Sequence, residues 1–384
     1  MKTPDPTQDG MLSFRVGDWV EVRSQEEILA TLDKNGSLEN LPFMPEMFAF
    51  CGQRFRVYKS AHKTCDTVNG SKGLRMRDAV HLDGIRCNGQ SHGGCEASCL
   101  IFWKTAWLRK LNPTDADSKL CDNPPVEKKE VLVGLCTAAD VLAATQKTTG
   151  EDGVTAYACQ ATQLPSATEP LPWWAWRQYL QDYTSGNAGL VRMFKGFLYM
   201  AYQQGLVNLG IGLGPVLRWI YDRFQEFRGG QPYPRRPGNL TAGARTPAIT
   251  LDLQPGEWVR VKSFDEIRAT CDKWNMNRGM RWDAELVPYC GGIYQVLKRV
   301  TKILDEKTGK MQEMKTPCII LDSVVCQARY SKCRLFCPRS IYSYWREIWL
   351  ERVATRSSHA AEATPTQPLA HHFQWNSASK NPQR

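Results

Sequence analysis

The sequence lacks the short motifs that mark the common enzyme classes. An HExxH motif, a GxSxG motif, a Walker A loop and a dinucleotide-binding fingerprint are all absent from its 384 residues. No pair of acidic residues recurs in a way that suggests acid–base catalysis. A binding protein is therefore the first expectation, and an enzyme is the alternative.

The N-terminus lacks an apolar segment. Its first residues, MKTPDPTQDGMLSF, contain no hydrophobic region of the kind that a secretory signal needs. We therefore expect a cytoplasmic protein whose fourteen cysteines are reduced. At this density some of the cysteines are expected to bind metal. The alternative is that they pack as small buried hydrophobic residues.

The sequence also has no dense run of Lys or Arg, although its net charge is +10. This moderate basic excess permits contact with nucleic acid, anionic lipid or an acidic protein, and it does not select among them. Apolar residues make up 42% of the chain and charged residues 23%, which is ordinary for globular proteins. The length suggests about two or three domains.

What the sequence does contain is an internal repeat. The stretch GDWVEVRS at 17–24 returns as GEWVRVKS at 256–263, a shift of 239 positions. The same shift places Cys51-Gly52 on Cys290-Gly291, and it holds over about seventy residues without a net insertion. We predict two copies of one module, at 13–111 and 252–354.

Local patterns predict the structure of each copy. WVEV and WVRV alternate apolar and polar residues, which is typical of a half-buried strand. Ser24 with Glu27, and Ser263 with Glu266, have the spacing of a capping box at the start of a short helix. Two further strands are expected in each copy, followed by a tryptophan-rich segment with i,i+4 spacing that fits a helix or a strand.

The Gly-Asp turn that leads into WVEV, with its counterpart GEWVRV, resembles the opening strand of small SH3-like barrels, including KOW-type modules. The resemblance covers about eight residues in each copy, and the glycine signature that follows in a KOW motif is absent. It implies a small β-barrel that binds a peptide, a protein or nucleic acid. The expected fold class is α+β, with two small barrel-like modules and short helices, separated by a mainly helical middle segment.

Four cysteines recur with the repeat. Their spacing is C-x35-C-x7-C-x3-C in the first copy and C-x35-C-x6-C-x3-C in the second. Four thiolates can bind zinc tetrahedrally, with sulfur at roughly 2.3 Å. We therefore predict about two zinc ions per chain. The predicted ligands are Cys51, Cys87, Cys95 and Cys99 in the first copy, and Cys290, Cys326, Cys333 and Cys337 in the second.

Other interpretations of these cysteines stay open. Buried packing thiols and an iron–sulfur cluster or redox pair are the alternatives, because thiolate ligation alone does not separate zinc from a cluster. His62, His81 and His92 lie only in the first copy. They are candidate accessory residues, as ligands or as part of a thiol–histidine site, so any such reaction would belong to the first copy alone.

The segment between the copies divides by composition. Residues 112–189 are expected to form a linker and a mixed α/β region, 190–227 an apolar to amphipathic helical segment, and 228–251 a hinge rich in Pro, Gly and Arg. Residues 355–384 are expected to be a disordered tail. Three cysteines in the middle segment have no repeat partner, and their role is not predicted: Cys121, Cys136 and Cys159.

Residues 196–217 carry no charge, yet their glutamines and glycines argue against a membrane span. Peripheral membrane contact through 190–225 stays possible, because this stretch is amphipathic and has flanking cations. The function expected from the sequence is a zinc-stabilised, tandem-module binding or scaffold protein for a protein or nucleic-acid partner. The alternative is an enzyme, or an enzyme partner, with a thiol/histidine or iron–sulfur site in the N-terminal module.

Overall fold

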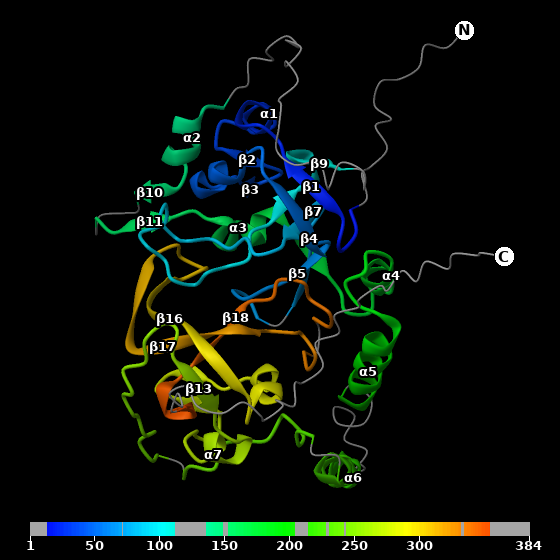
Figure 1. The fold of residues 1–384 in the computed structure, drawn as a ribbon, viewed down its shortest axis with the longest axis vertical. Coiled ribbons are helices and arrows are strands. Elements are labelled where there is room, and N and C mark those ends of the chain that lie inside the picture. Colours follow the sequence, from blue (N-terminus) through cyan, green and yellow to red (C-terminus); the bar gives the residue numbers. More distant parts are fainter. Residues whose placement is uncertain are drawn as a thin grey trace, which may run out of the picture.

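The computed structural model describes most of both repeat copies and parts of the segment between them (Figure 1). The described residues are 14–70, 72–111, 136–148, 153–203, 214–227, 230–241, 243–331 and 334–353. Cys121, Cys333 and the tail at 355–384 therefore lie outside the described residues. We call 14–111 the first module and 252–353 the second module.

The first module contains a five-stranded antiparallel sheet in the order β8-β7-β4-β1-β9. Strand β1 pairs with β4 on one side and with β9, the last strand of the module, on the other. The two ends of the module therefore meet at β1. The strands are β1 (Trp19–Val22), β4 (Arg54–Ser60), β7 (Ala79–Leu82), β8 (Trp103–Lys104) and β9 (Leu108–Lys110).

The second module contains a five-stranded antiparallel sheet with the corresponding order, β18-β17-β16-β13-β19. Trp258 lies opposite Gln295, as Trp19 lies opposite Arg56, so the registers agree at the shift of 239. The strands are β13 (Trp258–Val261), β16 (Ile293–Leu304), β17 (Met311–Val325), β18 (Tyr342–Trp345) and β19 (Leu350–Arg352).

Both expected capping boxes are confirmed. Ser24 caps α1 (Gln25–Leu29), where its side chain accepts from the Glu27 amide and Glu27 accepts from the Ser24 amide. Ser263 and Glu266 do the same for α7 (Phe264–Arg268). Each helix is little more than one turn long, so its stability comes from capping and from burial of Ile28 in α1, or of Phe264 and Ile267 in α7, rather than from propagation.

Four tryptophans form the centres of the two cores. Trp103, Trp107, Trp345 and Trp349 are all fully buried. Their i,i+4 spacing reflects neither one helix face nor one strand, because the first tryptophan of each pair lies in a strand and the second is the last residue of a 3₁₀ turn. These turns are η2 (Thr105–Trp107) and η5 (Glu347–Trp349).

The sheets are open rather than closed. In the described residues no sheet closes into a barrel, because the edge strands β8 and β9 are only two and three residues long and do not pair with each other. The α+β class is as expected, with helices and several small antiparallel sheets. The closed-barrel expectation is not met.

In each module a short hairpin and a 3₁₀ turn precede the first of the four repeated cysteines, Cys51 or Cys290. In the first module β2 (Ser37–Leu38) and β3 (Leu41–Pro42) form a hairpin before the 3₁₀ turn η1 (Pro45–Phe50). In the second module β14 (Met276–Asn277) and β15 (Met280–Arg281) form the matching hairpin before η4 (Ala284–Tyr289).

The middle segment is built into the first module instead of forming a separate unit. Its strand β12 (Glu169–Leu171) extends the hairpin of β5 (Lys63–Cys65) and β6 (Gly73–Arg75). Its helix α3 (Gln160–Ala167) packs against β3. The other elements before residue 190 are α2 (Ala138–Ala143), β10 (Gln146–Thr148), β11 (Thr155–Tyr157) and α4 (Arg177–Thr184).

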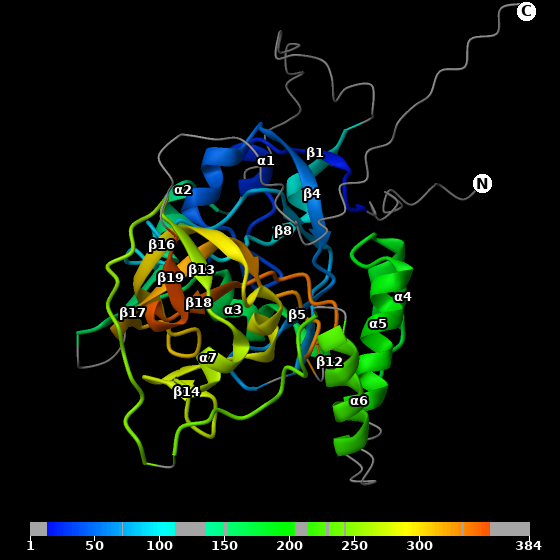
Figure 2. The ribbon, with the colours of Figure 1, turned by 60° about the horizontal axis from the view of Figure 1, so that its bottom comes forward.

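The two modules touch along a buried seam. Arg339 of the second module donates to Thr67 and to the Cys65 carbonyl of the first, at 3.0 and 3.3 Å. Lys63 of the first module donates to the carbonyl oxygen of Leu335 at 2.7 Å. Figure 1 shows the first module above the second, and both views place α4, α5 and α6 together along one side (Figure 2).

Residues 190–227 include α5 (Leu190–Ala201) and α6 (Gly214–Phe227). Within the described ranges, none of the helices is both long enough and apolar enough to cross a bilayer. Phe194, Leu198, Trp219 and Phe224 are exposed on these two helices, so the predicted peripheral contact retains a physical basis and stays a prediction.

Candidate metal centre

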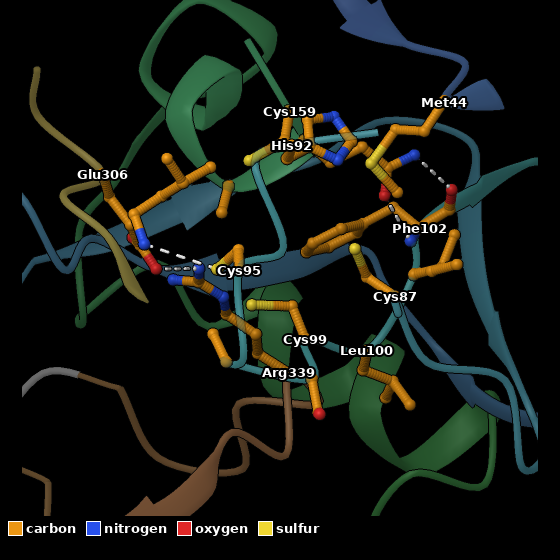
Figure 3. Close-up of a pocket in the computed structure, with 16 residues that line it drawn as sticks. Met44, Cys87, His92, Cys95, Cys99, Leu100, Phe102, Cys159, Glu306 and Arg339 are labelled. Carbon is orange, nitrogen blue, oxygen red and sulfur yellow. Dashed lines mark hydrogen bonds and ion pairs between the residues drawn. The ribbon is translucent and has the colours of Figure 1, made fainter. Parts of the chain in front are cut away.

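A narrow pocket lies where the first module, the middle segment and the second module meet (Figure 3). Its cavity volume is about 40 Å³. The loop between β7 and β8 provides most of the lining, Cys159 enters from the start of α3, and Glu306 and Arg339 come from the second module. The thiols that line the pocket belong to Cys87, Cys95, Cys99 and Cys159.

Three different donor groups converge at one end of this region. The side-chain donor atoms of Glu46, Cys87 and His92 all lie within 4.8 Å of one another. The Cys87 thiol donates to Glu46 Oε1 at 3.0 Å, and His92 Nδ1 lies 3.4 Å from the same oxygen. Within the described part of the chain, this is the one group of three or more such side chains whose donor atoms already lie that close together.

His92 is buried, Glu46 and Cys87 are partly buried, and two of these three side chains have polar atoms without a hydrogen-bond partner. His92 is 1% exposed, and neither of its ring nitrogens has a hydrogen-bond partner, because the contact to Glu46 is too poorly aligned to count as one. Glu46 Oε2 is also buried without a partner. Buried polar groups are rarely left in this state, since each costs about 1–3 kcal/mol. A metal ion would satisfy both.

The electrostatics of the cluster favour a metal ligand over a free nucleophile. Burial and the neighbouring Glu46 carboxylate raise the pKa of Cys87, so the thiol holds its proton in the absence of a cation. Burial would also raise the pKa of Glu46, but the nearby His92 ring and the hydrogen bond from the Cys87 thiol together outweigh it and hold that pKa below its usual value. A nucleophilic cysteine needs a lowered pKa, whereas a bound cation displaces the thiol proton directly.

A tight loop presents His92 and Cys95. The amides of His92 and Gly94 both donate to the carbonyl oxygen of Gly89 at 3.0 Å. Gly89 has a φ of +73°, and a Cβ at this position would lie 1.9 Å from the Cys95 carbonyl oxygen. Only glycine fits here.

The second module holds this loop in place. The Leu304 amide donates to the Cys95 sulfur at 3.3 Å, and Lys302 Nζ donates to the Gly93 carbonyl at 3.1 Å. Glu96 accepts from the Thr301 and Lys302 amides. The geometry of the candidate centre therefore depends on contacts between modules as well as on the loop itself.

The predicted first quartet is brought together only in part. Cys87, Cys95 and Cys99 line the pocket, but Cys51, at the C-terminal end of η1, does not. Cys159 lines the pocket instead. Sequence reasoning set Cys159 aside because it has no repeat partner.

Sequence reasoning also missed Glu46. The signal was present, because the shift of 239 places Glu46 on Glu285. Glu285 is buried too, and it accepts from the Arg329 and Tyr330 amides at 2.9 and 2.6 Å. A glutamate kept in register at a buried site is informative, because an ionisable side chain is rarely buried without partners.

The predicted second quartet is also brought together only in part. Cys326 and Cys337 pack with Cys65, which belongs to the first module. Cys290 packs elsewhere, in the core around Trp345 and Trp349. The prediction for Cys333 falls outside the described residues.

Cations surround this second group of thiols. The pKa of Cys65 is lowered, most of all by a hydrogen bond from Cys337 and to a smaller extent by the positive charges of Arg339 and Arg334. Arg339 Nη1 lies 3.9 Å from the Cys65 sulfur, and Arg339 also lines the first pocket. One buried guanidinium therefore stands between the two groups of cysteines.

The three histidines have different surroundings, and only His92 joins the cluster. His62 Nε2 lies 3.3 Å from Asp182 Oδ1, and its Nδ1 is 3.4 Å from the Ser60 hydroxyl. His81 is fully buried, and its Nδ1 lies 2.8 Å from the Ile101 carbonyl oxygen. Cys136 is buried in the core of the first module and does not line the pocket.

We expect His81 to make stability depend on pH. Burial lowers the pKa of His81 from 6.5 to about 3. Between pH 6.5 and about pH 3, the unfolded chain therefore binds a proton at His81 that the folded protein does not bind. The contribution of His81 to stability is complete above pH 6.5, and it is lost as the pH falls towards 3. The expected slope is about 1.4 kcal/mol per pH unit.

The matched variant for this test is His81→Ile, because Ile320 occupies the equivalent position in the second module. Urea unfolding between pH 4 and pH 7 should show a shallower dependence in the variant than in the parent. The lost contact to Ile101 lowers stability by a constant amount at every pH. Parallel curves would contradict a neutral, buried His81.

Comparison of the sequence with protein-family models finds no matching family. Comparison with curated proteins finds no significant similarity either.

Proposed function

We propose that this chain is a metal-stabilised binding or scaffold protein made of two linked modules. The observation that supports this most directly is the set of Glu46, Cys87 and His92, in which the buried His92 and one buried Glu46 oxygen have no partner. A cation that binds these three groups would remove the cost of burying them, and it would fix the loop that the two modules share.

Zinc is the metal that this donor set suits best. Carboxylate oxygen, thiolate sulfur and imidazole nitrogen are all zinc ligands, and structural zinc sites are four-coordinate. The fourth ligand would come from Cys95, Cys99 or Cys159, which line the adjoining pocket with Cys87 and His92 but do not lie within 4.8 Å of all three donors, so one of them would move on binding. An iron–sulfur cluster is less well matched, because such clusters are normally held by four cysteines.

The centre has a structural character. A cavity of about 40 Å³ has room for an ion or a water molecule but not for a substrate, since pockets for small molecules measure about 300–1,000 Å³. The raised pKa of Cys87 also opposes a thiol-based reaction. We therefore propose no reaction at this centre.

We infer that the two modules are copies of one folding unit. The matching strand orders support this, as does a shared hydrogen bond: Trp107 Nε1 donates to Thr31 in the first module, and Trp349 Nε1 donates to Thr270 in the second. In the first module β1 lies between β4 and β9, the last strand, and this arrangement also supports the SH3-like resemblance. Small modules of this kind bind peptides or nucleic acid.

We further propose that the second metal uses a ligand from the other module and draws its thiols together on binding, because the sulfurs of Cys65, Cys326 and Cys337 do not all lie within 4.8 Å of one another. Cys326 and Cys337 have Cys65 as their thiol neighbour in place of Cys290. Arg334 and Arg339 would offset the negative charge of a zinc–thiolate group. Such a centre would tie the modules together across the seam.

Metal analysis of the purified protein tests these assignments. We expect about two zinc ions per chain. His92→Ala should lose one of them, and Cys65→Ser should lose the other. Cys51→Ser and Cys290→Ser are the matched controls. Each removes a repeated cysteine that belongs neither to the pocket nor to the cluster of Cys65, Cys326 and Cys337. Both controls should keep two.

The opposite pattern would overturn the ligand assignment: metal lost from Cys51→Ser and Cys290→Ser but retained by His92→Ala and Cys65→Ser. X-ray absorption on the parent protein gives an answer that does not depend on variants folding. Nitrogen or oxygen as well as sulfur should appear in the zinc coordination shell. A shell of sulfur alone would exclude Glu46 and His92, and visible absorbance with iron content would replace zinc by a cluster.

A further inference from the structure

The helix α3 occupies a defined place on the first module. Gln160 Nε2 donates to the carbonyl oxygens of Phe102 and Pro42 at 2.8 and 3.2 Å, and Gln160 Oε1 accepts from the Phe102 amide at 2.8 Å. Asn40 donates to the Ser166 carbonyl at 3.3 Å. The chain thus covers this face of the first module with its own helix.

The equivalent face of the second module is an open groove. The shift of 239 places Asn40, Leu41 and Pro42 on Gly279, Met280 and Arg281, and alignment of Trp103 with Trp345 places Phe102 on Tyr344. All four of these second-module residues line a groove with a cavity volume of about 430 Å³. Among the described residues, none of the helices covers it as α3 covers the first module.

The charges of the two faces differ in a specific way. In the first module Lys104 Nζ is paired with the Glu39 carboxylate at 2.5 Å. The equivalent positions in the second module are Arg346 and Arg278, so a cation replaces the carboxylate. The pair in the first module is neutral, whereas the pair in the second carries two positive charges.

Arg346 is a nearly buried cation whose hydrogen-bond partners are carbonyl oxygens and the Cys318 sulfur, with no carboxylate among them. It is 6% exposed, and its guanidinium donates to the carbonyl oxygens of Arg278 and Thr316 at 2.8 and 2.5 Å. Its Nε is buried without an acceptor, and no carboxylate of the described residues lies within ion-pair distance of it. Arg281 and Lys315 also line the groove, against one acidic residue, Glu313.

We propose that this groove binds a short helical peptide segment of a partner protein, which carries a carboxylate for Arg346 and Arg278 and sits as α3 sits on the first module. The peptide's carboxylate would take the place that Glu39 has in the first module. Met280, Ile303 and Met314 supply apolar contact area for a helix. The inference rests on the proposed binding function and names the chemistry of the partner.

A peptide fits the groove better than nucleic acid does. The matching face of the first module is already occupied by a peptide helix held through backbone carbonyl and amide groups. A nucleic-acid strand would call for a basic track with aromatic side chains on which bases stack. Tyr344 is the one aromatic residue among those that line the groove.

The test uses full-length protein as purified, with a fluorescein-labelled peptide of residues 158–169, ACQATQLPSATE, in which Cys159 is replaced by Ser. This probe contains the α3 sequence and ends on Glu169. Fluorescence anisotropy should show saturable binding. Replacement of Glu169 by Gln with an amidated C-terminus removes the carboxylates and should weaken binding by about tenfold or more, since a charge-assisted hydrogen bond is lost.

Arg281→Glu places a charge reversal on an exposed residue of the groove and should weaken binding of the acidic peptide by a similar factor. Arg260→Glu is the matched control, because Arg260 is exposed on β13 of the same module and does not line the groove. It should bind the peptide as the parent does. Arg346→Lys, which keeps the charge but loses the guanidinium geometry, should bind more weakly than the parent.

Three results would overturn the proposal. One is equal binding of the acidic and the carboxylate-free peptides. Another is an equal effect of Arg281→Glu and Arg260→Glu. The third is saturable binding of a single-stranded DNA oligonucleotide, but not of the peptide, that Arg281→Glu abolishes. Zinc content is measured on the same samples, so that failure of the metal centre and failure of the groove are separate outcomes.

Discussion

Replacement of Lys63 by Met is expected to destabilise the protein by about 3–5 kcal/mol, because it leaves a buried carboxylate without its cation. Lys63 Nζ donates to Asp182 Oδ2 at 2.5 Å, and the exposed fractions of the two side chains are 3% and 0%. Burial lowers the pKa of Lys63, and Asp182 opposes that shift. The pair joins β5 to α4 at the seam.

Urea unfolding at pH 7 gives the measurement, and two further variants give the controls. Lys63→Met with Asp182→Leu removes both charges and should recover most of the lost stability, since a buried ion pair replaced by apolar groups is often near neutral. Arg77→Ala breaks the exposed pair of Arg77 and Glu169 and should cost less than about 1 kcal/mol. An equally small effect of Lys63→Met would contradict the dependence of the buried Asp182 carboxylate on Lys63.

Truncation of the central tryptophans should have effects of similar size. Trp107→Ala and Trp349→Ala are each expected to cost about 3–5 kcal/mol, because each removes a fully buried indole from the middle of a core. Trp107 packs edge-on against Phe43, and Trp349 packs in the same way against Trp282. The two cores should therefore respond alike.

The milder variants Trp107→Phe and Trp349→Phe keep a ring but remove the hydrogen bonds to Thr31 and Thr270. They should lose less stability than the alanine variants. Thermal unfolding followed by calorimetry distinguishes the series. A loss below 1 kcal/mol for either alanine variant would contradict the assignment of that tryptophan to a core centre.

The elements that the sequence predicted well are those whose signals are local. The capping boxes at Ser24 and Ser263 need only one side chain three residues from another, and both are present. The alternation in WVEV predicts β1 because strand periodicity is visible within four residues. The tryptophan spacing was ambiguous, since a 3₁₀ turn between two strands produces the same i,i+4 interval.

The parts that the sequence did not predict depend on contacts between distant segments. Nothing in the composition of 112–189 indicates that β12 pairs with β6, or that Gln160 reaches the backbone of Phe102. Cys51 and Cys290 follow the repeat in the sequence, but a repeated sequence pattern gives no distance between side chains. Cys65 and Cys159 lie beside the other thiols only because the chain folds back on itself.

The sharing of segments between modules has a consequence for protein synthesis. The first sheet can form once residue 111 has left the ribosome, but α3 and β12 end at residues 167 and 171. Lys63 must wait longer for Asp182, and longer still for the carbonyl of Leu335. The nascent N-terminal half therefore keeps part of its eventual interior in water until nearly the whole chain has been translated.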